Sequence, residues 1–450
     1  MKQENNKITT PIADFVKAYD KTDVARLHMP GHKGQGFLGC EMWDITEIGG
    51  ADSLYEADGI IAESEANATK IFGSQRTLFS TEGSSQCIRA MLYLAMLNKP
   101  KKRATIVAAR NVHKSFIHAA ALLDMDVVWL WPEEKVSSIC SCAISPKQVE
   151  TVLDTCEDVV AVYLTSPDYL GAQADIAAIA EVCHKREVIL AVDNAHGAYL
   201  KFLESSQHPL DFGADICCDS AHKTLPVLTG GAYLHISKNA PVIFAEQAKR
   251  AMELFGSTSP SYLIMASLDM CNRYLAEEYK ERLENMIDLR NGYCKQLEAL
   301  GWNVLESDPL KITVEIPWDI SSSKLTHRLR QHGVECEYVD QNYIVFMITP
   351  ENTKQDFERL VLGLGENVSV YHKKDYLPVH ATKQVLSIRE AMFSESETVT
   401  LAEAENRICR ASTVSCPPAI PIAVPGELIT KEMISLFQYY GITKLDVVKK

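Results

Sequence analysis

The chain has 450 residues, which is too long for one simple hydrophobic core and indicates two or three domains. Hydrophobic residues make up 46% of it and charged residues 23%, a balance typical of soluble globular proteins. The formal net charge of −14 argues against a nucleic-acid partner, because binding phosphates needs a basic face. The sequence begins without the apolar core of a signal peptide, and no window reaches the roughly 18 apolar residues of a membrane span. We therefore expect a cytoplasmic protein that does not bind membranes.

The 13 cysteines are scattered or too closely paired to form a zinc site. Cys140 and Cys142 form C-x-C, Cys217 and Cys218 are adjacent, and no C-x-x-C pair occurs. We expect reduced, mostly buried thiols and no metal.

From about residue 60 to 250, short apolar runs alternate with helical patterns such as residues 83–98 and 175–186. The runs are continuously apolar, as expected for strands that are covered on both faces. This alternation predicts an α/β fold with a mostly parallel sheet, whose ligands bind at the carboxyl ends of the strands. The six predicted strands are residues 104–109, 126–131, 158–164, 188–193, 215–218 and 231–236.

The pattern changes after about residue 260. A long helical stretch at 276–300 precedes the strand-like runs 311–316 and 343–348, which predicts a smaller α+β domain. The proline-rich segment 416–430 is unsuited to a central strand or a helix interior, so we assign it to a separate C-terminal domain.

Two strand ends carry residues suited to an anionic, heterocyclic ligand. Gly83 precedes Ser84 and Ser85 at the start of an amphipathic helix, where free N–H groups and the helix dipole favour an anion. An ordinary serine N-cap is the alternative. Asp193 ends a buried strand, where its carboxylate needs a partner such as a protonated ring nitrogen, a structural arginine or a helix cap.

Three further residues follow buried strands. His113 is placed where a planar ring could cover a ligand, although a lone histidine is more often structural. Ser166 stands in the turn after another strand. Lys223 lies between a serine–histidine pair and the run "TLPVLTGG"; alone, it would be interpreted as a lysine whose stem covers the core edge.

Together these features are what pyridoxal phosphate requires: a lysine for a Schiff base, a carboxylate for the pyridine nitrogen and a helix start for the phosphate. The order of the features on one predicted sheet favours a reactive role for Lys223 over a structural one.

At this point the sequence resembles the Orn/Lys/Arg decarboxylase family of fold-type-I pyridoxal-phosphate enzymes, in a short form without the flavodoxin-like N-terminal domain. The resemblance runs nearly end to end. The matching segments are "LHMPGHKG" (27–34), "DITEIGGADSL" (44–54), "STEGSS" (80–85), "RNVHKS" (110–115), "TSPDYLG" (165–171), "DNAHGA" (193–198), "DSAHKTLPVLTG" (219–230), "STSPSYLIMASLD" (257–269) and "CPPAIPIAVPGELIT" (416–430).

The resemblance implies a role for each matching residue. Lys223 would be the Schiff-base lysine, Asp193 would pair with the pyridinium nitrogen, and His113 would stack on the outer ring face. The other cofactor contacts that it implies are Ser84, Ser85, Ser220 and His222 near the phosphate, Ser166 near the ring hydroxyl, Ala195 beneath the ring and His196 lining the site. Ser257 and Thr258 would reach the cofactor phosphate of a neighbouring subunit, which implies a homodimer.

The resemblance also implies the domain order. We expect an N-terminal segment at 1–60, a pyridoxal-phosphate-binding large domain at 61–255, a small α+β domain at 256–370 and a C-terminal domain at 371–450.

The chain departs from the family pattern at a few positions. Asn194 replaces the usual glutamate of D-E-A-H, Ala419 replaces a glycine of the proline segment, and Gln86 and Cys87 replace the usual helix start. These changes spare Lys223, Asp193 and His113, so they put the identity of the substrate in doubt rather than the cofactor.

The resemblance therefore implies decarboxylation of arginine, lysine or ornithine to an amine of polyamine biosynthesis, and it implies Glu337 as the acidic group for the substrate's distal cation. A solvated charge is the alternative for Glu337. An aminotransferase or another lyase remains an alternative, because fold does not fix the reaction. A catalytically silent paralogue is a third, which the intact Lys223 and Asp193 disfavour.

Overall fold

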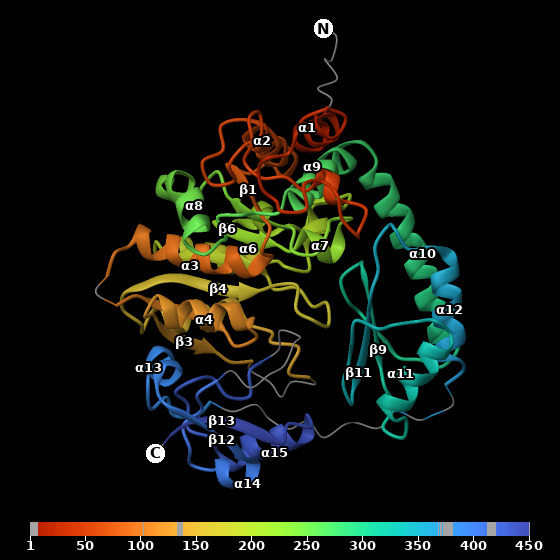
Figure 1. Cartoon of the computed structure of the whole chain (residues 1–450). Helices are drawn as coiled ribbons and strands as arrows, with labels where there is room; N and C mark the ends of the chain where they lie inside the picture. The colour runs from red at the N-terminus through yellow and green to blue at the C-terminus, as the bar shows by residue number, and fades with distance from the viewer. Residues whose placement is uncertain are drawn as a thin grey trace. The chain divides into compact units, whose positions relative to one another are not determined.

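The computed structural model describes residues 8–101, 103–132, 138–367, 369, 371, 381–411 and 420–449. The chain forms two compact units, whose elements can be followed by colour and label in Figure 1. The first unit comprises Met1–Lys99 and Leu190–Glu284, and the second comprises Pro100–Ile189 and Asn285–Lys450. Ala419 and the start of the proline-rich segment lie outside the described residues.

The main sheet has seven strands in the order β1-β7-β6-β5-β4-β2-β3. β7 runs antiparallel to both of its neighbours, whereas β5 pairs with β6, and β2 with both β3 and β4, in parallel. The strands are β1 (Arg76–Ser80), β2 (Thr105–Ala109), β3 (Asp126–Leu130), β4 (Val159–Thr165), β5 (Ile189–Asp193), β6 (Ile216–Asp219) and β7 (Ala232–Ile236). The prediction of an α/β fold with a mostly parallel sheet is confirmed.

In the first unit, helices pack on the strands that carry the site. α3 contacts β6 and β7, and α2 contacts β1. The helices are α1 (Pro11–Asp20), α2 (Ile60–Phe72), α3 (Ser84–Asn98), α7 (Ala221–Thr224), α8 (Val242–Leu254) and α9 (Tyr262–Glu277), with short 3-10 turns η1 (Glu41–Trp43), η2 (Ala198–Phe202) and η3 (Pro209–Phe212). α10 (Tyr279–Ala299) starts in this unit and continues into the second.

The second unit carries two small antiparallel sheets besides its strands of the main sheet. The first has the order β10-β11-β9-β8, from β8 (Val304–Leu305), β9 (Lys311–Glu315), β10 (Tyr338–Val339) and β11 (Tyr343–Met347). The second pairs β12 (Ser396–Thr400) with β13 (Lys444–Val448). The helices are α4 (Lys114–Leu122), α5 (Pro146–Leu153), α6 (Ile176–His184), α11 (Ser322–Gln331), α12 (Lys354–Leu364), α13 (Ile388–Phe393), α14 (Leu401–Ala404) and α15 (Lys431–Tyr439).

The six strands predicted from apolar runs each start and end within about one residue of an observed strand. The sequence analysis missed β1, and it read one helix at 276–300 where α9 ends at Glu277 and α10 begins at Tyr279. No described cysteine forms a disulfide. Among the described helices, none has both the length and the apolar character that crossing a membrane requires.

Candidate active site

Three strands of the first unit end at the same edge of the sheet. β5 and β6 are parallel, and β7 is antiparallel to both β6 and β1, so β1 also runs in the direction of β6. The predicted site residues follow these carboxyl ends: Ser84 after β1, Asp193 at the last position of β5, and Ser220 and Lys223 after β6. The direction of the strands therefore explains why residues so distant in sequence gather at one edge.

Ser84 and Ser220 form the part of this edge that suits a phosphate. Ser84 is the first residue of α3, a helix of 15 residues, and its Oγ accepts a hydrogen bond from Ser220 Oγ at 2.9 Å. Gly83 precedes the helix with φ of 69°, a left-handed conformation that glycine adopts without strain. The start of α3, where the helix dipole favours an anion, and the two hydroxyls together suit a phosphate.

The side chains around the start of α3 are fixed by hydrogen bonds. His222 Nδ1 lies 2.9 Å from the carbonyl oxygen of Gly231, and burial lowers the pKa of His222. Gln86, one of the departures from the family pattern, accepts from Ser80 at 2.6 Å and donates to Tyr55 and to the carbonyl of Met252, both at 2.8 Å. These three bonds of Gln86 therefore hold the start of α3 against its neighbouring segments.

Lys223 lies on the single turn α7, which follows Ser220. Its Nζ is 2.8 Å from Nε2 of His196, whose side chain is almost fully buried. Because an imidazole nitrogen accepts a proton readily near neutral pH, this contact places a base beside the amine. The pair can therefore hold or exchange one proton.

Asp193 is buried, with 2% of its surface exposed. Its Oδ1 accepts a hydrogen bond from the backbone N–H of Ala195 at 3.2 Å and lies 3.7 Å from Cys218 Sγ. The carboxylate thus fixes the turn that leads to His196. A buried carboxylate at a strand end suits a cationic ring nitrogen.

Ser257 and Thr258 are both exposed, after α8 in the first unit. The backbone N–H of Ser257 donates to the carboxylate of Glu82, and Ser257 Oγ accepts from the N–H of Ser259 at 3.1 Å. The turn is therefore ordered, and both hydroxyl-bearing residues face solvent in the single chain.

Three predicted residues belong to the second unit. His113 follows β2 and caps α4, with its Nδ1 accepting from the N–H of Ser115 at 3.2 Å. Ser166 follows β4, and its Oγ accepts from the N–H of Ala174 at 3.0 Å. β2 and β4 pair in parallel, so His113 and Ser166 leave the same edge of this unit's strands. Glu337 is exposed and accepts a hydrogen bond from the hydroxyl of Tyr169.

The sequence analysis missed a buried ion pair beside His113. Arg110, which is fully buried, donates from Nη1 and Nη2 to the two carboxylate oxygens of Glu427, at 2.9 and 2.7 Å. It also donates to the carbonyl of Pro421 and stacks over the rings of Trp129 and Trp131. The motif "RNVHKS" contained a signal, because an arginine directly after a buried strand needs a partner.

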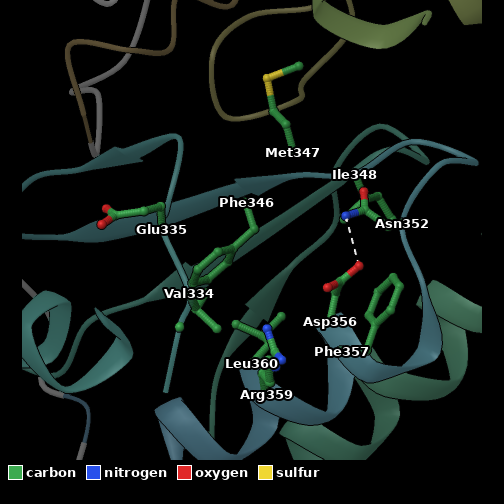
Figure 2. Close-up of a pocket in the computed structure, with 11 residues that line it drawn as sticks. Val334, Glu335, Phe346, Met347, Ile348, Asn352, Asp356, Phe357, Arg359 and Leu360 are labelled. Atoms are coloured by element: carbon green, nitrogen blue, oxygen red, sulfur yellow. Dashed lines mark hydrogen bonds between the residues drawn. The ribbon is translucent and has the colours of Figure 1, made fainter. Parts of the chain in front are cut away.

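A pocket of about 180 Å³ lies in the second unit, and none of the residues that line it is a predicted site residue. Its wall combines apolar side chains, such as Val334, Phe346, Phe357 and Leu360, with the polar side chains of Glu335, Asn352, Asp356 and Arg359. Figure 2 shows Asp356 in this pocket, hydrogen-bonded to Asn352. Asp356 also accepts from the N–H and hydroxyl of Thr353 at the start of α12, so its charge caps a helix.

The residues of the first-unit edge fit pyridoxal phosphate. Ser84, Ser220 and the start of α3 offer donors to its phosphate, Lys223 offers an amine to its aldehyde, and Asp193 offers a buried carboxylate to its ring nitrogen. Each of these contributions is a group whose charge and hydrogen-bonding capacity match the atom that it would meet.

Comparisons with known proteins agree with this fit. The profile of the Orn/Lys/Arg decarboxylase major domain matches residues 10–321, and that of the family's C-terminal domain matches residues 368–444. Arginine decarboxylases of Halalkalibacterium halodurans and Bacillus subtilis are each 29% identical, over 95% of this chain and 92% of theirs. The structure of the Francisella novicida lysine decarboxylase has a TM-score of 0.80 at 18% identity, over 98% of this chain and 81% of that chain.

The family profiles span both units and most of the described residues, and the relatives are similar over nearly their whole length. The resemblance noted in the sequence is therefore confirmed. The chain belongs to the Orn/Lys/Arg decarboxylase family and is a pyridoxal-phosphate-dependent decarboxylase of basic amino acids.

Proposed function

We propose that the substrate is arginine and that the enzyme releases CO₂ and the corresponding amine for polyamine biosynthesis in the cytoplasm. Relatives at 29% identity are named arginine decarboxylases, whereas a lysine decarboxylase of Escherichia coli is 20% identical. The observation that best supports this chemistry is the arrangement at the sheet edge of the first unit. There Lys223 Nζ lies 2.8 Å from Nε2 of His196, and Ser220 donates a hydrogen bond to Ser84.

Bound pyridoxal phosphate supplies an electron sink for the bond that breaks at the substrate's α-carbon. Asp193 makes this sink effective, because a buried carboxylate keeps a proton on the nitrogen that it faces. The hydrogen bond from Ala195 fixes the direction of that carboxylate. Ser84, Ser220 and the start of α3 would bind the phosphate and so position the cofactor.

Lys223 and His196 handle protons in the proposed mechanism. Lys223 would hold the cofactor through its amine, and the amine, once released, would need a nearby group with which to exchange protons. His196 Nε2 stands at hydrogen-bonding distance for this purpose. After CO₂ leaves, a proton must replace it at the α-carbon, and Lys223 and His113 are the two candidate donors.

The roles of His113, Ser166 and Glu337 rest on the family resemblance. We propose that His113 stacks on the cofactor ring, that Ser166 contacts its hydroxyl and that Glu337 recognises the guanidinium of arginine. Glu337 is exposed and shares a hydrogen bond with Tyr169, so its carboxylate can accept further donors. We keep the domain boundaries near residues 60, 255 and 370 as part of the proposal.

A product assay tests the proposed substrate. The purified protein, loaded with pyridoxal phosphate, is incubated with arginine, lysine or ornithine, and CO₂ and the amine are identified. We expect arginine to give the highest kcat/KM and the Asp193→Ala variant to lose most of its rate while remaining folded. A faster reaction with lysine or ornithine would overturn the arginine proposal, and formation of a keto acid without CO₂ would indicate an aminotransferase.

Reduction with borohydride tests the role of Lys223. The reagent fixes the cofactor to the amine that carries it, and peptide mapping then identifies the labelled lysine. We expect the label on Lys223, because this lysine alone follows Ser220 at the edge that also carries Asp193. A label on any other lysine contradicts the proposal.

We also propose that the enzyme acts as a homodimer, with each subunit contributing Ser257 and Thr258 to the other's phosphate site. The segment between α1 and α2 exposes large apolar side chains, with Leu27 at 93% and Leu38 at 85% exposure. Such a surface suits an interface with a second copy of the chain.

Complementation between two inactive variants tests the shared site. One variant carries Lys223→Ala, and the other carries Ser257→Glu with Thr258→Glu, which repels the phosphate. A mixed dimer has one site with an intact lysine and an intact hydroxyl pair, so random reassociation should recover about a quarter of the wild-type activity. A fully active monomer in sedimentation at the assay concentration would exclude the shared site.

A further inference from the structure

Asp219 is the centre of a buried hydrogen-bond network beside the candidate active site. It is the last residue of β6 and is fully buried. Its Oδ1 accepts from the side-chain amide of Asn194 at 2.7 Å, and its Oδ2 lies 3.1 Å from Nε2 of both His208 and His235. Burial raises the pKa of Asp219, but the two histidines outweigh this effect and the pKa is lowered. The carboxylate is therefore ionised.

The bond between Asn194 and Asp219 joins the ends of β5 and β6, the two strands that lead to Asp193 and Lys223. The parallel pairing of β5 and β6 ends where Asp193 faces Cys218, and the N–H of Asn194 donates to the carbonyl of Cys218 at 3.0 Å. Beyond this point the side-chain bond is a further link between the strands. Asp193 precedes Asn194 in the chain, and Asp219 precedes Ser220 and the turn that carries Lys223.

Asn194 fits this position because only its NH₂ group, and not its carbonyl oxygen, can face the carboxylate of Asp219. Its Oδ1 is buried without a hydrogen-bond partner among the described residues, which indicates that the contact with Asp219 decides how the amide points. The reversed amide would aim a carbonyl at a carboxylate. The glutamate or aspartate alternative would place two carboxylates in contact, and one of them would have to take up a proton.

The histidines extend the network to the neighbouring strand. His235 lies in β7, and its Nδ1 is 2.8 Å from the hydroxyl of Thr77 in β1. Burial lowers the pKa of His235, so its ring donates to Asp219 as a neutral imidazole. The described groups thus connect β1, β5, β6 and β7, all of which belong to the first unit.

The same residues also offer ligand atoms for a metal ion. Atoms of His208, Cys217 and Asp219 lie within 4.8 Å of one another. Two observations favour the hydrogen-bond network over a metal. Asp219 already accepts from three donors, and His208 Nδ1 has no hydrogen-bond partner among the described residues, whereas a metal-bound histidine normally donates its second nitrogen.

We propose that Asn194 and Asp219 are positioning residues that fix Asp193 and Lys223 relative to each other for cofactor binding. The inference rests on the proposed function only in taking Asp193 and Lys223 as the groups that contact the cofactor. It explains why this chain has an amide at position 194: the donor is needed to meet the ionised Asp219 at the end of the neighbouring strand.

The test compares the single variants Asn194→Asp and Asp219→Asn with the variant that carries both changes. Asn194→Asp brings two carboxylates into contact, and Asp219→Asn removes the negative charge that Asn194 and the two histidines meet. The double change restores one amide and one carboxylate in reversed order. We expect each single variant to weaken pyridoxal phosphate binding about ten-fold or more, and the double variant to recover most of this loss. Binding is measured by titrating the apoprotein with pyridoxal phosphate, so the result does not depend on which amino acid is the substrate.

Asp215→Asn is the matched control. Asp215 is also buried, and its carboxylate accepts from the N–H of Leu190 at 2.8 Å, at the opposite ends of β5 and β6. We expect this change to lower thermal stability without altering pyridoxal phosphate affinity or the pH midpoint of the bound cofactor's visible absorbance. The single variants at 194 and 219 should move that midpoint.

Three results would overturn the proposal. The first is that the single variants lose stability but match Asp215→Asn in pyridoxal phosphate affinity and in the pH midpoint of absorbance. The network would then have only a structural role. The second is a double variant that binds as weakly as the worse single variant. The third is stoichiometric metal in the purified protein that is lost in His208→Ala. If Asn194→Asp does not fold, Asn194→Ala removes the donor without adding a charge, and its affinity should still fall below that of the control.

Discussion

Asp219 and Glu427 are both buried carboxylates near loops that carry predicted site residues, but different partners stabilise them. Glu427 faces the guanidinium of Arg110 with two hydrogen bonds, so the pair is neutral as a whole. Asp219 is held by the amide of Asn194 and the rings of His208 and His235, three separate side chains rather than one guanidinium. Glu427 also accepts from the N–H of Val424, and its bonds to Arg110 tie this C-terminal segment to the residue that follows β2.

The difference indicates two purposes for a buried charge. A neutral ion pair holds two segments together but has little electrostatic effect on distant groups, because the fields of its two opposite charges cancel beyond a short distance. Asp219 has no such bidentate cation among the described residues, and it stands four residues from Lys223 in sequence. We therefore expect the Arg110–Glu427 pair to control folding of its unit and Asp219 to control the electrostatics of the lysine loop.

The largest effect on stability should come from breaking the ion pair. Glu427→Ala leaves the fully buried Arg110 without its carboxylate, and loss of one member of a buried pair destabilises by about 3–5 kcal/mol. Urea unfolding of the apoprotein measures the change. Glu427→Gln keeps the shape and one acceptor, so it should cost less. Equal losses for the two variants would show that packing, rather than charge, makes Glu427 important.

The sequence predicts the strands of the fold more completely than it predicts the partners of the buried charges. Continuous apolar runs identified six strands because a strand buried on both faces leaves a local signal. β1 was missed because "RTLFS" has a charged start, a polar end and only two apolar residues. The strand ends gave Ser84, Asp193 and Lys223 as candidates, since parallel strands bring their carboxyl ends to one edge.

The partners of buried charges could not be predicted in the same way. Arg110 and Glu427 are 317 residues apart, and no local pattern links them. His235 meets Asp219 because β7 folds back antiparallel to β6, a register that apolar runs do not determine. Asn194 was recognised only as a departure from the family, since its role depends on the carboxylate of the neighbouring strand.

A third buried carboxylate, Asp269, should have an intermediate effect on the free energy of unfolding, and this effect should depend on pH. Asp269 accepts from Ser64 Oγ at 2.6 Å and from the N–H of Ala13 at 2.9 Å, and burial raises its pKa to about 6. A carboxyl whose pKa is raised on folding stabilises the fold below its unfolded pKa of about 4, and this contribution is lost as the pH rises through 6. The pH window for Asp269 is therefore about 4 to 6.

The variant Asp269→Asn cannot ionise, so its stability relative to wild type should rise by about 3 kcal/mol between pH 4 and pH 7. Urea unfolding of both proteins across this range measures the difference. Asp219→Asn is the contrast, because the lowered pKa of Asp219 contributes stability that is present above about pH 4 and is lost on acidification. The same slope for both variants would contradict the assignment of opposite pKa shifts.

The smallest effect should come from an exposed ion pair in the second unit. Arg186, after α6, donates to Asp154 at 2.6 Å and to Glu150 at 3.3 Å, but the side chain of Asp154 is 55% exposed. Water already solvates both charges, so their contact replaces hydration that is nearly as favourable. Arg186→Gln should therefore change Tm by about 1 °C or less, and salt near 0.5 M should abolish the change. Thermal unfolding of this variant beside Glu427→Gln separates the two kinds of pair, since salt should leave the Glu427→Gln loss intact. If Arg186→Gln costs as much as Glu427→Gln, burial is not what distinguishes them, and the Arg110–Glu427 pair loses its special role in folding.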